Sequence, residues 1–306
     1  MKRDLDMIYN ANRDNFDLLE MHIPRRYIRD MENPMEVYHE TQFKMRFRLS
    51  KDVVRNILLP MIVCGDLRRL NQATVSRCIK RFTRRISAHS RNYIKFPHNE
   101  EGLQETQNLY KRIANFPNIT GCIACSHISI INPGGPHAEL FRNRKRTFSI
   151  NVQVIAGPRL EIFDIVARYP GSYHDSHIFD RSSVKGKFQR RELPGYLLGD
   201  AGYPCLPYLL TPFREVRTPG ERNYNRAQIH TRNVVERLVG VLKRLFPCLR
   251  HGLGTKVSTS CYIIVACAVL YNIALAHREI VEEPIQINDE FPEVPFQEEE
   301  MKVLVI

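Results

Sequence analysis

Three carboxylates stand in settings from which a chain can build a metal site. Asp175 lies in the stretch YHDSHIF, Asp200 ends the apolar run YLLGD, and Glu236 lies in the helical stretch TRNVVERLVGVLKRLF. Carboxylate oxygens are the hard ligands that Mg²⁺ and Mn²⁺ prefer, and such sites keep positions open for water and phosphate. Two ions held in this way can stabilise the attacking and the leaving oxygen of a phosphodiester. The three acids therefore indicate metal-dependent phosphoryl transfer.

The first two acids each have a structural alternative. Asp175 follows Ser172 at the spacing of a capping box, so the pair can simply begin a helix. Asp200 can form an Asx turn that opens the next loop. In favour of a functional role, we expect Asp200 at the C-terminal tip of a strand, where α/β sheets place their ligands. Neither acid identifies a site by itself.

Glu236 has the least specific setting of the three. It points away from the centre of the apolar stripe of its predicted helix, and Asn233 can form a capping pair with it. Both features indicate a solvated acid in the first turn of a helix. Gly240, one turn further on, favours the functional alternative, because it leaves space beside the carboxylate for a substrate or an ion.

The stretch NITGCIACSHISII, residues 118–131, predicts a strand that runs through the centre of the fold. It is short, β-branched and apolar, and prolines bound it on both sides. A metal site of this kind usually takes an acid from a central strand, but the middle of this one holds Ala124, Cys125 and Ser126. Cys122 and Cys125 form a C-x-x-C pair without a second pair at zinc-ribbon spacing, so we interpret them as buried reduced thiols.

Short apolar runs from residue 116 onward predict the elements that must position these residues. We expect strands in residues 118–131, 147–157, 160–171 and 195–204, and helices in residues 172–188, 231–246 and 258–277. Three consecutive strands, then alternating helix and strand, then helices, indicate an α/β sheet with helices packed on it. The apolar run 261–277 is at the short limit for a membrane span and contains Asn272, so we expect a buried core helix.

A basic helical region precedes the sheet. Residues 46–62 predict a helix capped by Ser50, and QATVSR within residues 67–86 resembles the start of a helix-turn-helix recognition helix. We expect Val75, Ile79 and Phe82 to pack inward, and five cations to meet phosphates: Arg77, Lys80, Arg81, Arg84 and Arg85. The alternative is a basic amphipathic helix on the surface.

The charge is unevenly distributed along the chain. The formal net charge is +12, but residues 279–306 carry nine acids and one lysine, so this tail has −8 and residues 1–278 have +20. A body this basic favours a polyanionic partner, commonly nucleic acid, over a role of the charge in solubility alone. The charged start of the chain has no apolar core for a signal peptide, which indicates the cytosol or the nucleus.

Composition then divides the chain into four parts. We expect a charged N-terminal segment at 1–48, a helical, helix-turn-helix-like region at 49–98, the main α/β domain at 116–278 and an acidic disordered tail at 279–306.

Several stretches together resemble one family. FPNITGCIACSHISI, RNRKRTFSINVQVI, YPGSYHDSHIFDRS, YLLGDAGYP, YNRAQIHTRNVVERLVGVLKRLF and the 258–277 helix occur in the order typical of the Harbinger transposase-derived nucleases, which are DDE-superfamily endonucleases of PIF/Harbinger type. The resemblance covers about residues 45–278. It implies an RNase H-like mixed sheet, a divalent Mg or Mn cofactor bound by Asp175, Asp200 and Glu236, action on DNA, a nuclear location, and in some members a separate Myb-like protein partner.

The chain departs from this family at two places. The family strand reads like G-C-I-D-x-x-H-I, with the first catalytic acid at its fourth position, and here that position is Ala124. Neither Cys125 nor Ser126 replaces a carboxylate, and a shift of one residue turns a side chain to the other face of a sheet. Upstream, the segments NILLPMI and GDLRRLNQATVSR nearly touch, so the helical region is shorter than in other members.

We therefore expect a nuclear, divalent-metal-dependent DNA endonuclease by descent, whose hydrolysis of phosphodiester bonds is impaired by Ala124. The alternative is a catalytically inactive nuclear module that binds DNA or protein. A zinc hydrolase that uses His174, Asp175 and His177 is disfavoured, because no third ligand follows at useful spacing. No membrane partner is expected.

Overall fold

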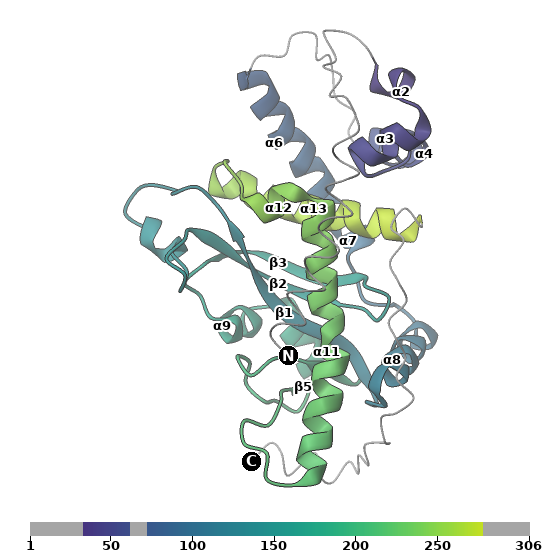
Figure 1. Cartoon of the computed structure of the whole chain (residues 1–306), viewed down its shortest axis with the longest axis vertical. Coiled ribbons are helices and arrows are strands. Elements are labelled where there is room, and N and C mark those ends of the chain that lie inside the picture. Colours follow the sequence, from purple (N-terminus) through teal and green to yellow (C-terminus); the bar gives the residue numbers. More distant parts are fainter. Residues whose placement is uncertain (1–32, 62–71, 278–306) are drawn as a thin grey trace, which may run out of the picture. The chain divides into compact units, whose positions relative to one another are not determined.

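The computed structural model describes residues 33–61 and 72–277 of the chain (Figure 1). Of the described residues, 33–47 belong to one compact unit and those from Arg48 onward to another. Two helices are described in the first unit, α2 at Pro34–Val37 and α3 at Glu40–Phe47. Asn33 caps α2, because its side chain accepts a hydrogen bond from the amide of Met35 at 3.1 Å.

The second unit begins with a helical region. Ser50 caps it as predicted, since its Oγ accepts from the Val53 amide at 3.3 Å. The helix continues without a break through α4 (Lys51–Val53), the π-helical turn η1 (Val54–Leu58) and α5 (Leu59–Met61). After residues 62–71, which lie outside the described part, come α6 at Gln72–Ala88 and α7 at Ser90–Tyr93. The turn expected in a helix-turn-helix falls in the gap and stays a prediction.

Helix α6 packs one face against α13 (Val257–Ala276). Phe82 lies against this cluster as predicted, and Ile86 is fully buried in it. The prediction for Ile79 was wrong, because this side chain is 41% exposed. The helix presents Ile86, one turn beyond Phe82, to α13 instead. The side chain of Val75 lies outside the described part.

The sheet has five strands in the order β3-β2-β1-β4-β5. Their bounds are Ile119–Ser129 for β1, Ser149–Ala156 for β2, Ile162–Pro170 for β3, Tyr196–Leu198 for β4 and Leu209–Leu210 for β5. The first three strands pair antiparallel, whereas β1 with β4 and β4 with β5 pair parallel. The four predicted strands are thus present, in a mixed sheet of the RNase H-like kind.

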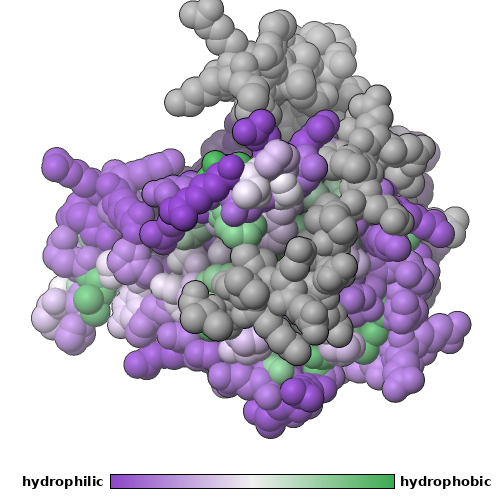
Figure 2. Space-filling view, turned by 90° about the horizontal axis from the view of Figure 1, so that it is seen from below, coloured by the Kyte–Doolittle hydropathy of each residue, from purple (hydrophilic) through white to green (hydrophobic). Residues whose placement is uncertain are grey.

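Helices cover both faces of this sheet. Their bounds are α8 at Glu100–Ala114, the 3-10 turn η2 at Ala138–Phe141, α9 at Asp175–Asp180, α10 at Ser183–Gln189, α11 at Pro219–Leu245 and α12 at Pro247–His251. In Figure 1, α11 is the long vertical helix that crosses in front of the sheet. Together with α13 it forms the larger core cluster, and α9 with α10 forms the smaller one. The described surface seen from below is mainly hydrophilic, with hydrophobic side chains in small groups (Figure 2).

Three helix predictions need correction. The helix expected at 172–188 is two helices, because α9 ends at Asp180 and Ser182 caps α10 through its Oγ. The helix expected from residue 231 begins twelve residues earlier at Pro219, where Thr218 and Glu221 form a capping box. Helix α8, capped by Asn99, was not predicted.

Helix α13 confirms the expected core helix. It is long and apolar enough to cross a membrane, but 61% of its most apolar window is buried inside the protein. Asn272 explains the one strongly polar position: its side chain accepts from the Ile162 amide at 2.9 Å and donates to the carbonyls of Ile162 and Tyr93, both at 2.8 Å. The acidic tail predicted at 279–306 and most of the segment predicted at 1–48 lie outside the described residues.

Candidate active site

Asp175 is held by the sheet rather than by a helix cap. Helix α9 begins at Asp175 itself, and its N-cap residue, His174, makes no side-chain capping bond. The capping box with Ser172 was therefore the wrong alternative. Asn151 of β2 donates from Nδ2 to Asp175 Oδ1 at 2.9 Å and to the Tyr173 carbonyl at 3.0 Å. This amide fixes one carboxylate oxygen, and the Cys125 thiol also hydrogen-bonds to the Asp175 side chain.

Asp200 lies directly after β4, and the Asx turn expected there is present. Its Oδ1 accepts from the amide of Gly202 at 2.9 Å. A Cβ built on Gly202 would lie 3.0 Å from Asp200 Oδ1 and 4.0 Å from Asp175 Oδ2. The two carboxylates therefore approach each other across a glycine that leaves the space between them open. The turn and the pairing with Asp175 are compatible, so the Asx turn does not exclude a function.

A half-buried thiol and a buried phenol lie next to the acid pair. Cys125 Sγ and the Tyr203 hydroxyl are 3.2 Å apart. Burial raises the pKa of the Cys125 thiol, and the negative charges of Asp175 and Asp200 raise it further. Burial likewise raises the pKa of Tyr203, with the same two acids contributing. Both groups stay protonated at neutral pH, so Cys125 is not a thiolate nucleophile.

Glu236 lies in the interior of α11, not in a first turn, so the predicted capping pair with Asn233 was wrong. Its Oε1 forms an ion pair with Arg232 Nη2 at 2.8 Å, and the Glu236 side chain is 56% exposed. A Cβ built on Gly240 would meet nothing within 4 Å, which confirms the open space predicted one turn beyond Glu236. The Arg232 side chain is only 14% exposed, so this buried arginine holds the exposed Glu236 carboxylate in position.

Ala124 faces the α11 side of the sheet. It belongs to the same core cluster as Val235 and Leu238 of α11, whereas Cys125 packs with the cluster on the opposite face. This is the alternation of side chains expected along a strand. It also separates Cys122 from Cys125: both thiols are free, and they belong to different clusters, so the C-x-x-C pair cannot close on one ion.

The acid pair has a donor set that fits a hard divalent cation. Among residues 33–61 and 72–277, no three histidine, cysteine, aspartate or glutamate side chains are grouped to hold a metal ion. Two amide oxygens on the neighbouring strand β2, Asn151 Oδ1 and Gln153 Oε1, are buried and have no hydrogen-bond partner in the described part. Gln153 lies opposite Cys125 in the β1–β2 register, on the face of Asp175. Such oxygens suit Mg²⁺ or Mn²⁺. The structure brings Asp175 and Asp200 together and places Glu236 in a separate ion pair.

Asn151 and Gln153 were missed by reasoning from the sequence. The signal was present in SINVQVIA, because two large amides interrupt a strand whose residues are all buried. Polar side chains at such positions need a partner or a ligand.

The five cations predicted to meet phosphates lie on the exposed side of α6. Arg77, Lys80, Arg81, Arg84 and Arg85 are all exposed in the structure, and they occupy the side of the helix that α13 does not cover. Several phosphates could be contacted at once from such a surface.

Comparison with known proteins gives the class first. Residues 123–272 match the family described as "DDE superfamily endonuclease". Over these residues the chain is similar to DDE superfamily endonucleases.

The chain is homologous to the Harbinger transposase-derived nuclease HARBI1 and to ALP1-like proteins, which confirms the resemblance read from its motifs. It is 31% identical over 217 residues to the protein of Rattus norvegicus named "Putative nuclease HARBI1", and 30% identical to that of Homo sapiens. Each match covers 70% of this chain and 62% of the relative. "Protein ALP1-like" of Arabidopsis thaliana is 29% identical over 167 residues, which are 50% of this chain and 40% of that protein. No solved structure matches.

Proposed function

We propose that the chain is a transposase-derived, divalent-metal-dependent DNA endonuclease whose hydrolysis of phosphodiester bonds is weakened by Ala124. The observation that carries this proposal is the approach of Asp175 and Asp200 across Gly202, with one oxygen of Asp175 fixed by Asn151. Two carboxylates and unpartnered amide oxygens are the ligands that a hard divalent cation takes.

Each residue has a distinct part in this proposal. Asp175 and Asp200 bind the cation, and Glu236 is the third acid, held beside the open space at Gly240. When bound, the cation supplies charge stabilisation and an activated water for phosphodiester hydrolysis. Asn151 orients Asp175, and the protonated Cys125 and Tyr203 add no charge to the site.

Ala124 limits what the remaining acids can do. A methyl group cannot bind a cation, and a site with one bound ion stabilises the attacking and the leaving oxygen less well than a site with two. The surroundings of Ala124 are apolar, with Val235 and Leu238 in the same cluster. An aspartate at this position would therefore be costly to bury without a cation beside it.

Nicking of supercoiled plasmid in Mn²⁺ tests the proposal. We expect a trace of nicking from the unmodified chain, a clear gain from Ala124→Asp, and loss of that gain when Asp200→Ala is added. Mn²⁺ binding, measured by the electron paramagnetic resonance of free Mn²⁺, gives a readout besides activity. It should tighten in Ala124→Asp and weaken in Asp175→Asn. Strong nicking by the unmodified chain that survives Asp200→Ala would overturn the proposal.

The alternative is a catalytically inactive module that binds DNA or protein. The apolar environment of Ala124 favours it, because nothing there replaces the missing carboxylate. DNA binding without cleavage by both the unmodified chain and Ala124→Asp would select this alternative. For either function we propose a nuclear location and DNA as the partner, with a Myb-like protein as a second partner.

A further inference from the structure

Four segments meet at the C-terminal half of β1, next to the acid pair. Lys243 of α11 donates from Nζ to Ser126 Oγ at 2.8 Å and to the His127 carbonyl at 3.2 Å. His127 Nδ1 lies 3.0 Å from Ser149 Oγ at the start of β2. Arg144, in the loop before β2, donates from Nη2 to His174 Nδ1 at 2.7 Å. His174 directly precedes Asp175, so this bond ties the loop to the start of α9.

The loop that carries Arg144 has a fixed conformation. Asn143 is buried, and its Oδ1 accepts from the amides of Lys145 at 2.9 Å and Thr147 at 3.1 Å. Its Nδ2 donates to Ser149 Oγ at 3.0 Å. Arg146 adopts a left-handed conformation with φ of 62°. Arg144 and Lys145 are exposed on this pinned loop, so little ordering is needed before they can bind.

Arg144, Lys145 and Lys243 form what we call the basic cluster. Lys243, Lys145 and Arg144 all act on His127: burial lowers the pKa of this imidazole most, Asp175 raises it, and the three cations lower it further. The pKa of Lys243 is itself lowered, by burial and then by Lys145. The cations are thus close enough to repel one another, which costs free energy that a bound anion would offset.

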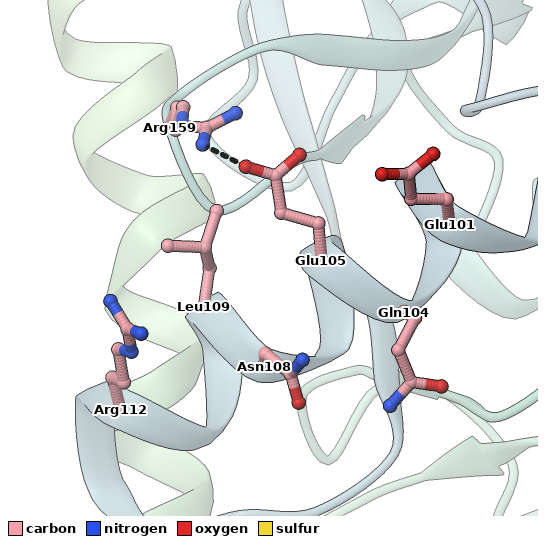
Figure 3. A pocket seen from close by; sticks show the side chains of 7 residues that line it. All are labelled: Glu101, Gln104, Glu105, Asn108, Leu109, Arg112 and Arg159. Atoms are coloured by element: carbon pink, nitrogen blue, oxygen red, sulfur yellow. Dashed lines mark hydrogen bonds and ion pairs between the residues drawn. The ribbon is translucent and has the colours of Figure 1, made fainter.

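The basic cluster differs from the paired cations near the sheet. In the part of the chain that the structure describes, none of its three members is in an ion pair with a carboxylate. By contrast, Arg142 pairs with Glu139 at 2.7 Å and Arg159 pairs with Glu105 at 2.5 Å. The groove over α8 in Figure 3, which Arg159 and Glu105 line, has mixed charge and no comparable excess.

We propose that the basic cluster binds the phosphodiester backbone of DNA without a metal ion, beside Asp175 and Asp200. The proposal deepens the proposed function, since it rests on DNA as the substrate and assigns the residues that hold its backbone at the site. Lysine and arginine are the usual partners of phosphates, lysine as a point charge and arginine as a planar fork. The carboxylates of Asp175 and Asp200 repel phosphates that no cation separates from them. This repulsion restricts the positions that the DNA backbone can take at the site.

The experiment measures duplex DNA binding in EDTA as a function of salt. Each lost phosphate contact lowers the slope of log affinity against log salt by about 0.9. We expect Arg144→Ala with Lys145→Ala to lower the slope by about 2 and Lys243→Met, which keeps the buried stem, by about 1. The matched control is Lys111→Ala with Arg112→Ala on α8, which removes the same charge from two exposed positions and should leave the slope unchanged.

Three outcomes would overturn the proposal. The first is an unchanged slope for the Arg144 and Lys145 double variant with an unchanged melting temperature. The second is an equally large decrease of the slope for the α8 control, which would mean that DNA binding depends only on the net charge of the protein. The third is equal competition by polyglutamate, which would identify an acidic protein partner instead. Failure of the nuclease proposal is separate, because it appears as absent nicking in Mn²⁺ while binding in EDTA still depends on the basic cluster.

Discussion

Asn272→Ala should destabilise the protein although alanine is the better helix former. Asn272 lies within α13, and its side chain makes three hydrogen bonds, two to the backbone of Ile162 and one to the Tyr93 carbonyl, at 2.8 to 2.9 Å. Each bond contributes about 1 kcal/mol net, and a buried group left without a partner costs about 1–3 kcal/mol. The gain in helix propensity offsets only about 0.5 kcal/mol. We expect a net loss of about 2–3 kcal/mol.

Urea unfolding followed by circular dichroism measures this loss. The midpoint should fall while the slope with urea stays constant, because the surface exposed on unfolding does not change. Ser258→Ala, an exposed polar-to-alanine change in the first turn of the same helix, is the matched control and should stay within about 0.5 kcal/mol of the unmodified chain. Unchanged or increased stability of Asn272→Ala would refute the reasoning, since it would show that water satisfies the freed backbone groups at no cost.

Three further predictions follow from the described contacts. Arg81→Ala with Arg84→Ala should lower the salt slope of duplex DNA binding by about 2, because each removed cation on the exposed face of α6 loses a phosphate contact. Asp164→Asn should stabilise the protein at pH 8 by as much as about 3 kcal/mol and have little effect at pH 4, as urea unfolding at the two pH values would show, because burial raises the pKa of Asp164 from 3.8 to about 6. Gly202→Ala should weaken Mn²⁺ binding without lowering the melting temperature, because the new Cβ lies 3.0 Å from Asp200 Oδ1.

The pH prediction has a definite sign. A carboxyl whose folded pKa is raised stabilises the fold below its unfolded pKa, and that contribution is lost as the pH rises through the folded value, here about 6. A variant whose advantage is the same at both pH values would contradict it. For α6, an unchanged salt slope would remove this helix from the DNA interface. For Gly202→Ala, Mn²⁺ binding equal to that of the unmodified chain would separate the acid pair from the metal.

Local patterns predicted the sheet well, because its strands are short apolar runs ended by breakers. The four predicted strands correspond to β1, β2, β3 and β4. Helix starts were predicted less well, although caps were readable. Thr218 and Glu221 have the spacing of a capping box and begin α11, and Asn99 precedes two glutamates at the start of α8. The helix was predicted only over the part of α11 where the apolar pattern is strongest, from residue 231 onward.

The site could be predicted only in part, because tertiary contacts decide it. Ser172 has the right spacing to cap a helix at Asp175, but its amide bonds to the Leu140 carbonyl, and Asn151 takes the carboxylate instead. Arg232, the ion-pair partner of Glu236, lies four residues before it and could be predicted from the sequence. The hydrogen bond between Lys243 and Ser126 joins residues far apart in the sequence and could be found only from the structure. The roles of Asp175, Asp200 and Glu236 as catalytic acids stay predictions.

Both edges of the sheet have features that hinder an incoming strand. At one edge, Asn272 occupies the amide and the carbonyl of Ile162 that would otherwise pair outward, and β3 ends at Pro170 with two irregularities in its register to β2. At the other edge, β5 has only two residues. Proteins block edge-to-edge aggregation by covered, bulged or very short edge strands. Pairing of an extended peptide with the sheet is therefore hindered at the start of β3 and at β5, the two places where β-augmentation would begin.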